Sequence, residues 1–405
     1  MEKYTVIIPT KNSEETLKYT LQTCLQQNYS NFEILVSDNF SSDNTSDLIH
    51  SINDARIKYI KTPRPLSMTE NFEFALSNVK EGFIMFIGAD DGLMPNAISY
   101  VNGIVLKYNA KAVSCQYAHY FWPNVPIAEK GKLTLYGLDL YKNDIEVRNS
   151  SEWLQKTLDF ETAQYVCELP NLYYGFVHYS IIEKSKKNNV YFKSITPDAY
   201  SAMVTAINIE SYVFSYSPFS IAGISGKSNG LSQMINGDIA KDFVSDNVHP
   251  IHKDFVFSPA MEVILGEAFY QLKDNFPAEC SAYKIDMKKM LMLAKFKSND
   301  ATRKEVYDSA LKMATLHKIE VRDIKITRAY KVNNFFRLFF RLGKDFCRKP
   351  NLYIGVKDTI KFNVHNVMDA SLLLGFMLNF NKGFKIDTLS TRFLKKISKR
   401  LLFRN

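Results

Sequence analysis

Residues 83–95, FIMFIGADDGLMP, decide the fold prediction, because a short apolar run ends there in two adjacent carboxylates. The first five residues have the length and character of a buried strand, and Gly88 breaks the run. Asp90 and Asp91 follow directly. Two neighbouring acids cost desolvation energy and repel each other unless a positive charge lies beside them. The stretch therefore predicts a strand end that presents paired carboxylates to a cation.

The chain around this stretch alternates between strand and helix patterns up to about residue 117. Short β-branched runs are typical of buried strands, whereas apolar residues spaced three or four apart are typical of helices. Ser67 and Glu70 stand at capping-box spacing and mark one helix start. The predicted strands are 4–9, 32–37, 56–61, 82–88 and 110–117, and the predicted helices are 14–27, 47–52, 67–79 and 95–108.

This alternation predicts an α/β fold with a mostly parallel, Rossmann-like sheet and helices on both of its faces. Ligands bind to such sheets outside the carboxyl ends of the strands. Asp38 follows one predicted strand, and Asp90 and Asp91 follow another. We therefore expect all three acids to lie on one edge of the sheet and to form a candidate site.

The rest of the chain has a different texture. Residues 122–230 are irregular and rich in aromatic side chains, residues 225–238 form a loop rich in Gly, Ser and Asn, and the chain after residue 254 is mainly helical. A length of 405 residues is enough for two or three domains. We predict an α/β domain over residues 1–235 and a mainly helical domain over residues 236–405.

The net charge of +9 is unevenly distributed. Residues 325–405 contain 18 Lys and Arg but four Asp and no Glu, so their net charge is +14, and the preceding residues carry −5. Residues 391–405, TRFLKKISKRLLFRN, place apolar side chains on one helical face with Lys and Arg around it. This pattern predicts contact with an anionic membrane surface. A core-packing helix with a solvated basic face is the alternative, and no nucleic-acid module is present to support a nucleic-acid partner.

Other features restrict the class of protein. The sequence contains no apolar segment long enough to span a bilayer and no signal-peptide pattern at its start, which predicts a cytosolic protein, peripheral on the inner face of the membrane if the tail binds lipid. Five widely spaced cysteines favour reduced thiols over a disulfide framework or a zinc site. No GxSxG, P-loop or GxGxxG motif is present, which argues against hydrolase, ATPase and dinucleotide-binding functions.

The stretches VIIPTKNSEETLKYTLQTCLQQNYSNFEILVSDNFSSDNTSDLI (6–49), RIKYIK (56–61) and FIGADDGLMPNAI (86–98) resemble the opening of the family-2, GT-A-type inverting glycosyltransferases. The likeness covers about the first 105 residues in consistent order and spacing. It implies a GT-A fold that binds a nucleotide-sugar donor across the strand ends, with UDP as the expected nucleotide. It also implies a role in bacterial surface polysaccharide assembly, such as capsule or O-antigen.

The resemblance assigns residues to the donor site. Pro9 and Thr10 would line the base pocket, and Asp38 would contact the base or the ribose, for which a carboxylate acceptor is suited. A helix-capping or loop acid is the alternative interpretation of Asp38. The remaining donor-site candidates, each of which has a surface or packing role as its alternative, are Arg64, Asn71 and Lys227, the last on a loop able to close over the diphosphate.

Asp90 and Asp91 match the acidic metal motif of the family, and Asp90 is the first choice as ligand. A hard divalent cation, Mn²⁺ or Mg²⁺, is suited to oxygen ligands and to a diphosphate leaving group. Many relatives carry a further acid two positions before Asp90, where this chain has Gly88. Tight metal binding before the donor arrives is therefore not expected.

Asp198, in SITPDAYSAMVTA, stands at a predicted helix start where family members place the general base. An inverting displacement needs such a base beside the acceptor hydroxyl, opposite the departing diphosphate. Helix capping is the alternative role for Asp198, and weaker candidates for the base are Asp159, Glu161 and Glu168.

Together these features predict a metal-dependent glycosyltransferase that acts on a glycan acceptor, with a lipid-linked oligosaccharide as the expected form. Two alternatives stay open. One is a GT-A domain that binds nucleotide or glycan without turnover, and the other is a peripheral membrane scaffold that uses the basic tail.

Overall fold

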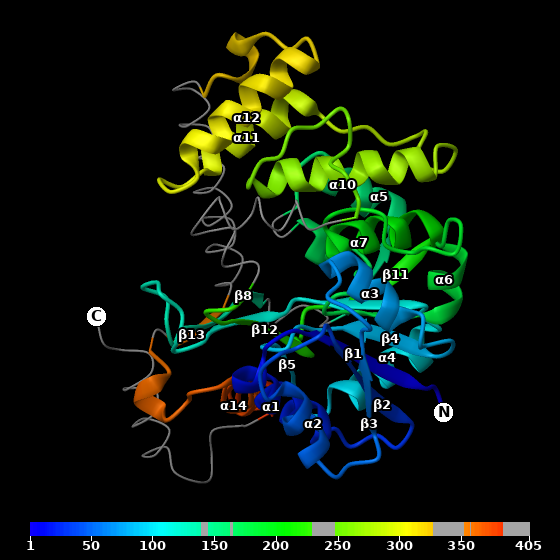
Figure 1. Ribbon diagram of the computed structural model, residues 1–405, viewed down its shortest axis with the longest axis vertical. Coiled ribbons are helices and arrows are strands. Elements are labelled where there is room, and N and C mark those ends of the chain that lie inside the picture. The colour runs from blue at the N-terminus through cyan, green and yellow to red at the C-terminus, as the bar shows by residue number, and fades with distance from the viewer. Residues whose placement is uncertain (139–144, 163–164, 229–247, 327–351, 357, 384–405) are drawn as a thin grey trace.

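The computed structural model describes residues 1–138, 145–162, 165–228, 248–326, 352–356 and 358–383 (Figure 1). Its centre is an eight-stranded sheet with the strand order β3-β2-β1-β4-β10-β6-β11-β9. Six of these strands run in one direction, and β10 and β9 run against their neighbours. The predicted mostly parallel α/β fold is confirmed. The strands are β1 (Tyr4–Thr10), β2 (Phe32–Asp38), β3 (Ile57–Lys61), β4 (Phe83–Phe86), β6 (Ala112–Cys115), β9 (Ile145–Asn149), β10 (Phe176–His178) and β11 (Ser211–Ser215).

Local sequence signals account for the first helices, which are α1 (Glu14–Leu25), α2 (Thr45–Ser51), α3 (Met68–Leu76) and α4 (Ala97–Tyr108). The predicted capping box is present, because the Ser67 side chain accepts a hydrogen bond from the Glu70 N–H and the Glu70 side chain accepts one from the Ser67 N–H. Helix α4 starts two residues later than predicted, since Asn96 has a left-handed backbone with φ of 59°.

The sheet is buried on both faces, as its alternating side chains require. In β1, Ile7 belongs to a core that continues into α3, α7 and α10, whereas Val6 and Ile8 belong to a second core with α1 and α4. Cys24, Cys115 and Cys280 are buried and Cys167 is half-buried, and each is an unpaired thiol, as predicted. Cys347 lies outside the described residues.

A second sheet, with the order β13-β8-β7-β12-β5, stands beside the first. Its strands are β5 (Gly92–Leu93), β7 (Ala118–Phe121), β8 (Leu133–Leu138), β12 (Ser220–Ile224) and β13 (Leu352–Val356). The chain returns to this sheet near its end, because β13 pairs with β8 and α14 (Val367–Gly383) packs against α1. The Ser371 hydroxyl also donates a hydrogen bond of 2.7 Å to the Leu93 carbonyl.

The remaining helices lie above the first sheet in Figure 1, where α10 packs on α7 and α11 packs between α10 and α12. The predicted domain boundary at residue 235 falls within 229–247, outside the described residues, and stays a prediction. So does the membrane role of residues 391–405. Across the described ranges, no helix has both the length and the apolar character to cross a bilayer. The remaining helices that the structure describes are α5 (Ser150–Leu158), α6 (Tyr179–Lys184), α7 (Pro197–Asn208), α10 (Met261–Asn275), α11 (Met287–Lys297) and α12 (Arg303–Leu316).

The second sheet meets the loop after β4 in a close backbone contact at Gly223. A Cβ atom at this position of β12 would lie 1.7 Å from the Asp90 carbonyl oxygen and 2.9 Å from Trp122 Nε1. The Trp122 Nε1–H donates a hydrogen bond of 3.0 Å to that same carbonyl. The absence of a side chain at Gly223 therefore allows the two sheets to hold the Asp90 backbone between them.

We predict that Gly223→Ala destabilises the protein, because the methyl group would overlap the Asp90 carbonyl oxygen. A main-chain oxygen cannot move aside as the end of a flexible side chain could. The free energy of unfolding should fall by about 3 kcal/mol, measured by urea unfolding. Gly103→Ala in α4 is the matched control, since an added Cβ has open space there, and it should raise stability by about 0.5–1 kcal/mol. Equal stability of the Gly223→Ala variant and the wild type would contradict the contact.

Candidate functional site

The last residues of three neighbouring strands form one row at the edge of the first sheet. Thr10 ends β1, Asp38 ends β2 and Lys61 ends β3, and the strand register pairs Thr10 with Asp38 and Asp38 with Lys61. Strand β4 lies on the other side of β1, so Asp90 follows the same edge. The predicted acidic residues therefore share the carboxyl edge of the sheet, which is where ligands bind in folds of this kind.

Asp38 is fully buried, and both of its carboxylate oxygens are in use. Oδ1 accepts a hydrogen bond of 2.8 Å from the Ser41 N–H, and Oδ2 accepts one of 2.7 Å from the Tyr59 hydroxyl. The bond from Ser41 closes a turn over residues 38–41. In this arrangement Asp38 shapes the rim through the turn, and its side chain is closed to solvent.

Thr10 offers the opposite case. Its Oγ1 is buried, and it is one of the buried side-chain atoms without a hydrogen-bond partner in the described part of the chain. Pro9, beside it, is half-buried. A buried hydroxyl with no protein partner is costly unless water or a ligand satisfies it.

Asp91 is the most constrained acid of the site. Its Oδ1 accepts from the Gly223 N–H at 2.7 Å and from the Tyr174 hydroxyl at 3.0 Å. Its Oδ2 accepts from the Gly88 N–H at 2.5 Å and from the Tyr173 hydroxyl at 3.1 Å. Burial and the neighbouring charge of Asp90 raise the pKa of Asp91 to about 8. With four donors on two oxygens, Asp91 joins three segments of the chain and has no free oxygen for a metal.

Asp90 is half-buried and uses one oxygen. Its Oδ2 accepts from the Ser225 N–H at 3.2 Å, from the Ser225 hydroxyl at 2.7 Å and from the Ser228 hydroxyl. Its Oδ1 accepts from no other residue that the structure describes. Burial raises the pKa of Asp90. Asp90 is therefore the acid that can offer an oxygen to a bound group.

Lys227 lies in the same turn after β12. Its Nζ donates a hydrogen bond of 3.1 Å to the Asn12 carbonyl, so the turn bridges from Asp90 to the loop after β1. This places an ammonium group close to the ends of both β1 and β4. Diphosphate oxygens at this edge would meet that positive charge.

The structure leaves no room for an acidic side chain at position 88, where this chain has Gly88. A Cβ atom at this position would lie 2.9 Å from Asp91 Oδ2, 2.9 Å from the Tyr173 hydroxyl oxygen and 3.0 Å from Asp90 Oδ1. A third carboxylate at Gly88 would enter space that the Tyr173 hydroxyl already fills.

Asp198 lies in the first turn of α7, directly after Pro197. It is half-buried, and burial raises the pKa of its carboxyl group. The pKa of the Tyr173 hydroxyl is raised by burial and then by the charges of Asp91, Asp90 and Asp198. Geometry links the two regions through Asn171. Its Oδ1 accepts from the Tyr173 N–H at 2.9 Å and from the Ser201 hydroxyl of α7 at 3.3 Å, so the helix that carries Asp198 is tied to the segment whose Tyr173 bonds Asp91.

A tyrosine and a cysteine complete the side of the site next to Asp198. The Tyr117 hydroxyl contacts Cys167 Sγ, and the Asp198 charge contributes to raising the pKa of both groups after burial. The Tyr117 ring lies 4.5 Å from that of Tyr174, measured between centroids. These half-buried aromatic groups provide a surface suited to an amphipathic ligand such as a sugar.

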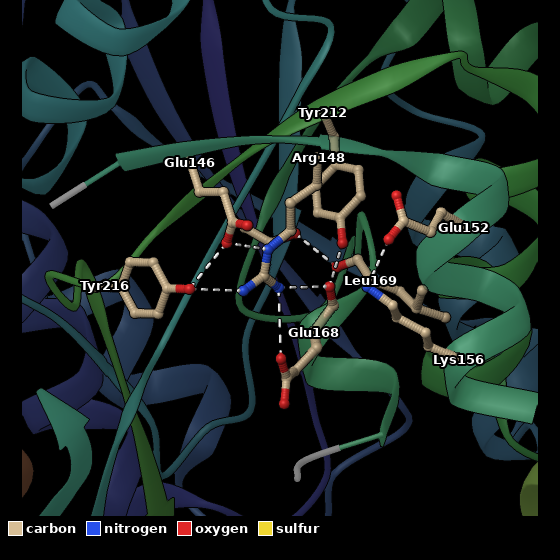
Figure 2. A network of polar contacts seen from close by, with 9 residues as sticks. Glu146, Arg148, Glu152, Lys156, Glu168, Leu169, Tyr212 and Tyr216 are labelled. Carbon is tan, nitrogen blue, oxygen red and sulfur yellow. Dashed lines mark hydrogen bonds and ion pairs between the residues drawn. The ribbon is translucent and has the colours of Figure 1, made fainter. Parts of the chain in front are cut away.

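Figure 2 shows the polar network around Arg148. The buried Arg148 of β9 donates to Glu146 Oε2 at 2.8 Å and to the Glu168 carbonyl at 3.2 Å. The Tyr212 hydroxyl donates to the same Glu168 carbonyl. Since Glu168 follows Cys167, the network fixes the segment that carries Cys167 to the site.

The other predicted residues contact protein groups or solvent in this structure. The Arg64 side chain is largely exposed and pairs with Glu70 at 3.1 Å. Asn71 is buried, and its Oδ1 accepts a hydrogen bond of 2.8 Å from the Ser37 hydroxyl. Among the weaker base candidates, Glu168 pairs with Arg148, Asp159 accepts from Gln155, and Glu161 is exposed. None of these contacts brings the five residues to the Asp90–Asp198 region, and their predicted ligand roles remain untested.

Sequence reasoning missed the groups that surround the Asp pair, which are Tyr173, Tyr174, Gly223, Ser225 and Ser228. They come from segments 82 or more residues away from Asp91 along the chain. One signal was available: adjacent tyrosines before Gly175 in an aromatic-rich stretch, NLYYGF. Their contact with Asp91 depends on tertiary pairing that no local pattern encodes.

Comparison with known proteins finds a family match in the N-terminal part of the chain. Residues 5–186 match the model of "Glycosyl transferase family 2". The chain is 31% identical over 115 residues to the Escherichia coli UDP-Glc:alpha-D-GlcNAc-diphosphoundecaprenol beta-1,3-glucosyltransferase WfgD, covering 28% of this chain and 44% of that protein. It is also 31% identical over 137 residues to the Campylobacter jejuni GalNAc(5)-diNAcBac-PP-undecaprenol beta-1,3-glucosyltransferase, covering 33% of this chain and 41% of that protein.

The chain thus spans less than half the length of these two curated relatives. Among solved structures, S. aureus TarS 1–349 in complex with UDP-GlcNAc is similar with a TM-score of 0.46 at 15% identity, covering 80% of this chain and 88% of that one. The matched segment contains β1 to α6 and both members of the Asp90–Asp91 pair. Residues 5–186 of this chain are therefore similar to glycosyl transferase family 2.

Proposed function

We propose that the protein is an inverting glycosyltransferase that moves a sugar from a nucleoside diphosphate donor, with UDP as the expected nucleotide, to a glycan acceptor. The observation that carries the proposal is the Asp90–Asp91 pair at the carboxyl edge of the sheet, within the segment that matches the family-2 model, with α7 and its Asp198 linked to Tyr173 through Asn171. A binding protein or a scaffold needs no buried carboxylate beside such a site, whereas sugar transfer needs a base there.

The donor would lie along the row from Thr10 to Asp90. The unpartnered hydroxyl of Thr10 supports a polar contact at the nucleoside end, and Lys227 supports a charge contact at the diphosphate. Asp38 holds the turn at the rim through Ser41 and Tyr59. Contact between Asp38 and the base would require the buried side chain to become accessible.

Mn²⁺ or Mg²⁺ fits the site on one condition. The described residues contain no group of three or more His, Cys, Asp or Glu side chains that could hold a metal by themselves. Asp90 Oδ1 can supply one ligand, and diphosphate oxygens and water would supply the others, as is common for Mg²⁺. A cation bound in this way would neutralise the charge that develops on the leaving diphosphate.

Asp198 would act as the general base. Its carboxylate would accept the proton of the acceptor hydroxyl while that oxygen forms a bond to the anomeric carbon. The bond from the anomeric carbon to the diphosphate oxygen would break on the opposite face, which inverts the configuration and releases the nucleoside diphosphate. Burial raises the pKa of Asp198, and a base whose pKa is closer to the working pH accepts a proton more readily.

The acceptor is proposed to be a glycan linked to a lipid diphosphate, because the printed names of the E. coli and C. jejuni relatives describe such acceptors. Capsule or O-antigen assembly is the process that such an acceptor serves. The basic residues after position 325 support a peripheral position on the inner face of the cytoplasmic membrane, where the acceptor would be located.

Asp90 and Asp91 should respond differently to removal of their charge. We predict that Asp90→Asn weakens UDP-dependent Mn²⁺ binding by about ten-fold or more in titration calorimetry, with the melting temperature nearly unchanged, because Asp90 is the free ligand. Asp91→Asn should instead lower the free energy of unfolding by about 1–3 kcal/mol, since an amide NH₂ would face the backbone N–H of either Gly88 or Gly223. A stable Asp91→Asn variant that loses Mn²⁺ would reverse these roles.

Asp198→Asn should lower kcat for sugar transfer by about 100-fold or more and leave the Kd for UDP within two-fold, because it removes the base and spares the donor site. The base must be ionised, so wild-type activity should fall as the pH drops through the pKa of Asp198. Since burial raises that pKa, the loss should occur at a higher pH than for an exposed aspartate. Glu161→Gln is the control and should keep full activity. Full turnover by Asp198→Asn would exclude this role.

The membrane contact is tested by sedimentation with liposomes. The full chain should pellet with vesicles that contain anionic phosphatidylglycerol and should stay in solution with neutral phosphatidylcholine vesicles, because the interaction is electrostatic. A chain that ends at Lys385 should lose this binding. Unchanged pelleting of the shortened chain would reject the role of the tail.

A further inference from the structure

Phe40 is an exposed aromatic residue at the edge that the donor would occupy. Its side chain is 47% exposed, although it lies two residues after Asp38 and thus directly beyond the row of strand ends. In the described part of the chain, Phe40 and Phe376 are the two phenylalanines that stand out as exposed large hydrophobic side chains. Single exposed apolar side chains are common on protein surfaces, and what distinguishes Phe40 is its place beside the row of strand ends.

The backbone of Phe40 is also unfavourable. Its φ is +58°, in the left-handed region that non-glycine residues adopt at a cost in free energy. Such a conformation persists where the surroundings over-determine it, and such residues cluster at ligand sites.

The surrounding turn holds Phe40 in this conformation from both sides. Asp38 Oδ1 accepts from the Ser41 N–H at 2.8 Å, and the Ser41 hydroxyl oxygen accepts from the Asn12 N–H at 2.8 Å. The Asn39 N–H donates to the Thr10 carbonyl at 2.8 Å. The buried acid of the rim therefore contributes to the display of a strained, exposed ring.

A cation accompanies the ring. Lys61 Nζ lies 5.5 Å from the centroid of the Phe40 ring, and it donates to the Ser41 carbonyl at 3.5 Å. A flat apolar face beside an ammonium group suits a planar heterocycle that carries carbonyl acceptors. The edge thus combines a stacking surface, a hydrogen-bond donor and the unpartnered Thr10 hydroxyl.

We propose that Phe40 is a specificity-determining residue that stacks on the nucleobase of the donor, with Lys61 beside it. The inference rests on the proposed function, because it assigns the base-binding part of the same donor site. Asp38 acts on the nucleobase indirectly, as the residue that positions Phe40.

The test compares UDP, which has a base, with inorganic pyrophosphate, which has none, both titrated with Mn²⁺ present. Phe40→Leu keeps the left-handed strain but removes the aromatic face, and it should weaken UDP binding about five- to a hundred-fold while pyrophosphate binding stays within two-fold. Phe40→Tyr keeps the face and should stay within two-fold of the wild type for both. Phe40→Gly should weaken UDP in the same way without lowering the melting temperature, because glycine relieves the strain.

Phe376→Leu, on α14, is the matched control, since its ring is 52% exposed but lies away from the row of strand ends. It should leave both affinities unchanged. Phe40→Leu binding UDP as tightly as the wild type, or losing UDP and pyrophosphate equally, would overturn the stacking role and leave the proposed function intact. Failure of the wild type to bind either ligand would instead refute the proposed function.

Discussion

The carboxylate of Asp91 and the four donors around it connect three parts of the chain that are far apart in the sequence. Gly88 belongs to the end of β4, Gly223 to β12 of the second sheet, and the two tyrosines to the segment before β10. Burying an acid is costly unless its oxygens are satisfied, and here each oxygen accepts one backbone N–H and one phenol. The relative position of the two sheets therefore depends on a group that would be unstable at this place without them.

The division of labour between the adjacent acids follows from this constraint. Both oxygens of Asp91 are used in hydrogen bonds within the protein. The backbone of the neighbouring Asp90 is held by Trp122 and Gly223, and Asp90 has one carboxylate oxygen left to offer a ligand. Tyr173 also connects this arrangement to α7, because its hydroxyl is bonded to Asp91 and its N–H donates to the same Asn171 oxygen that accepts from Ser201.

The sequence predicted what is encoded locally. Strands β1 to β4, helices α1 to α4 and the capping box at Ser67 follow from periodicity and from side chains that bond their own backbone. The shared edge of Asp38, Asp90 and Asp91 also followed, since parallel strands end together. The burial of Asp38 and the four hydrogen bonds of Asp91 could not be predicted, because both depend on partners such as Tyr59 and Tyr174 that only the tertiary structure brings close. The return of residues 352–383 to the second sheet was likewise hidden, since β13 is a short strand within a chain region of helical and basic character.

That return has a consequence for synthesis on the ribosome. Strand β8 ends at Leu138, but its outer neighbour β13 begins at Leu352, more than 200 residues later. Until translation has passed that point, the nascent chain carries β8 as an open strand edge, and such edges recruit other chains. The strands of the first sheet are made before β13, so the second sheet is completed only after residues 352–356 have emerged.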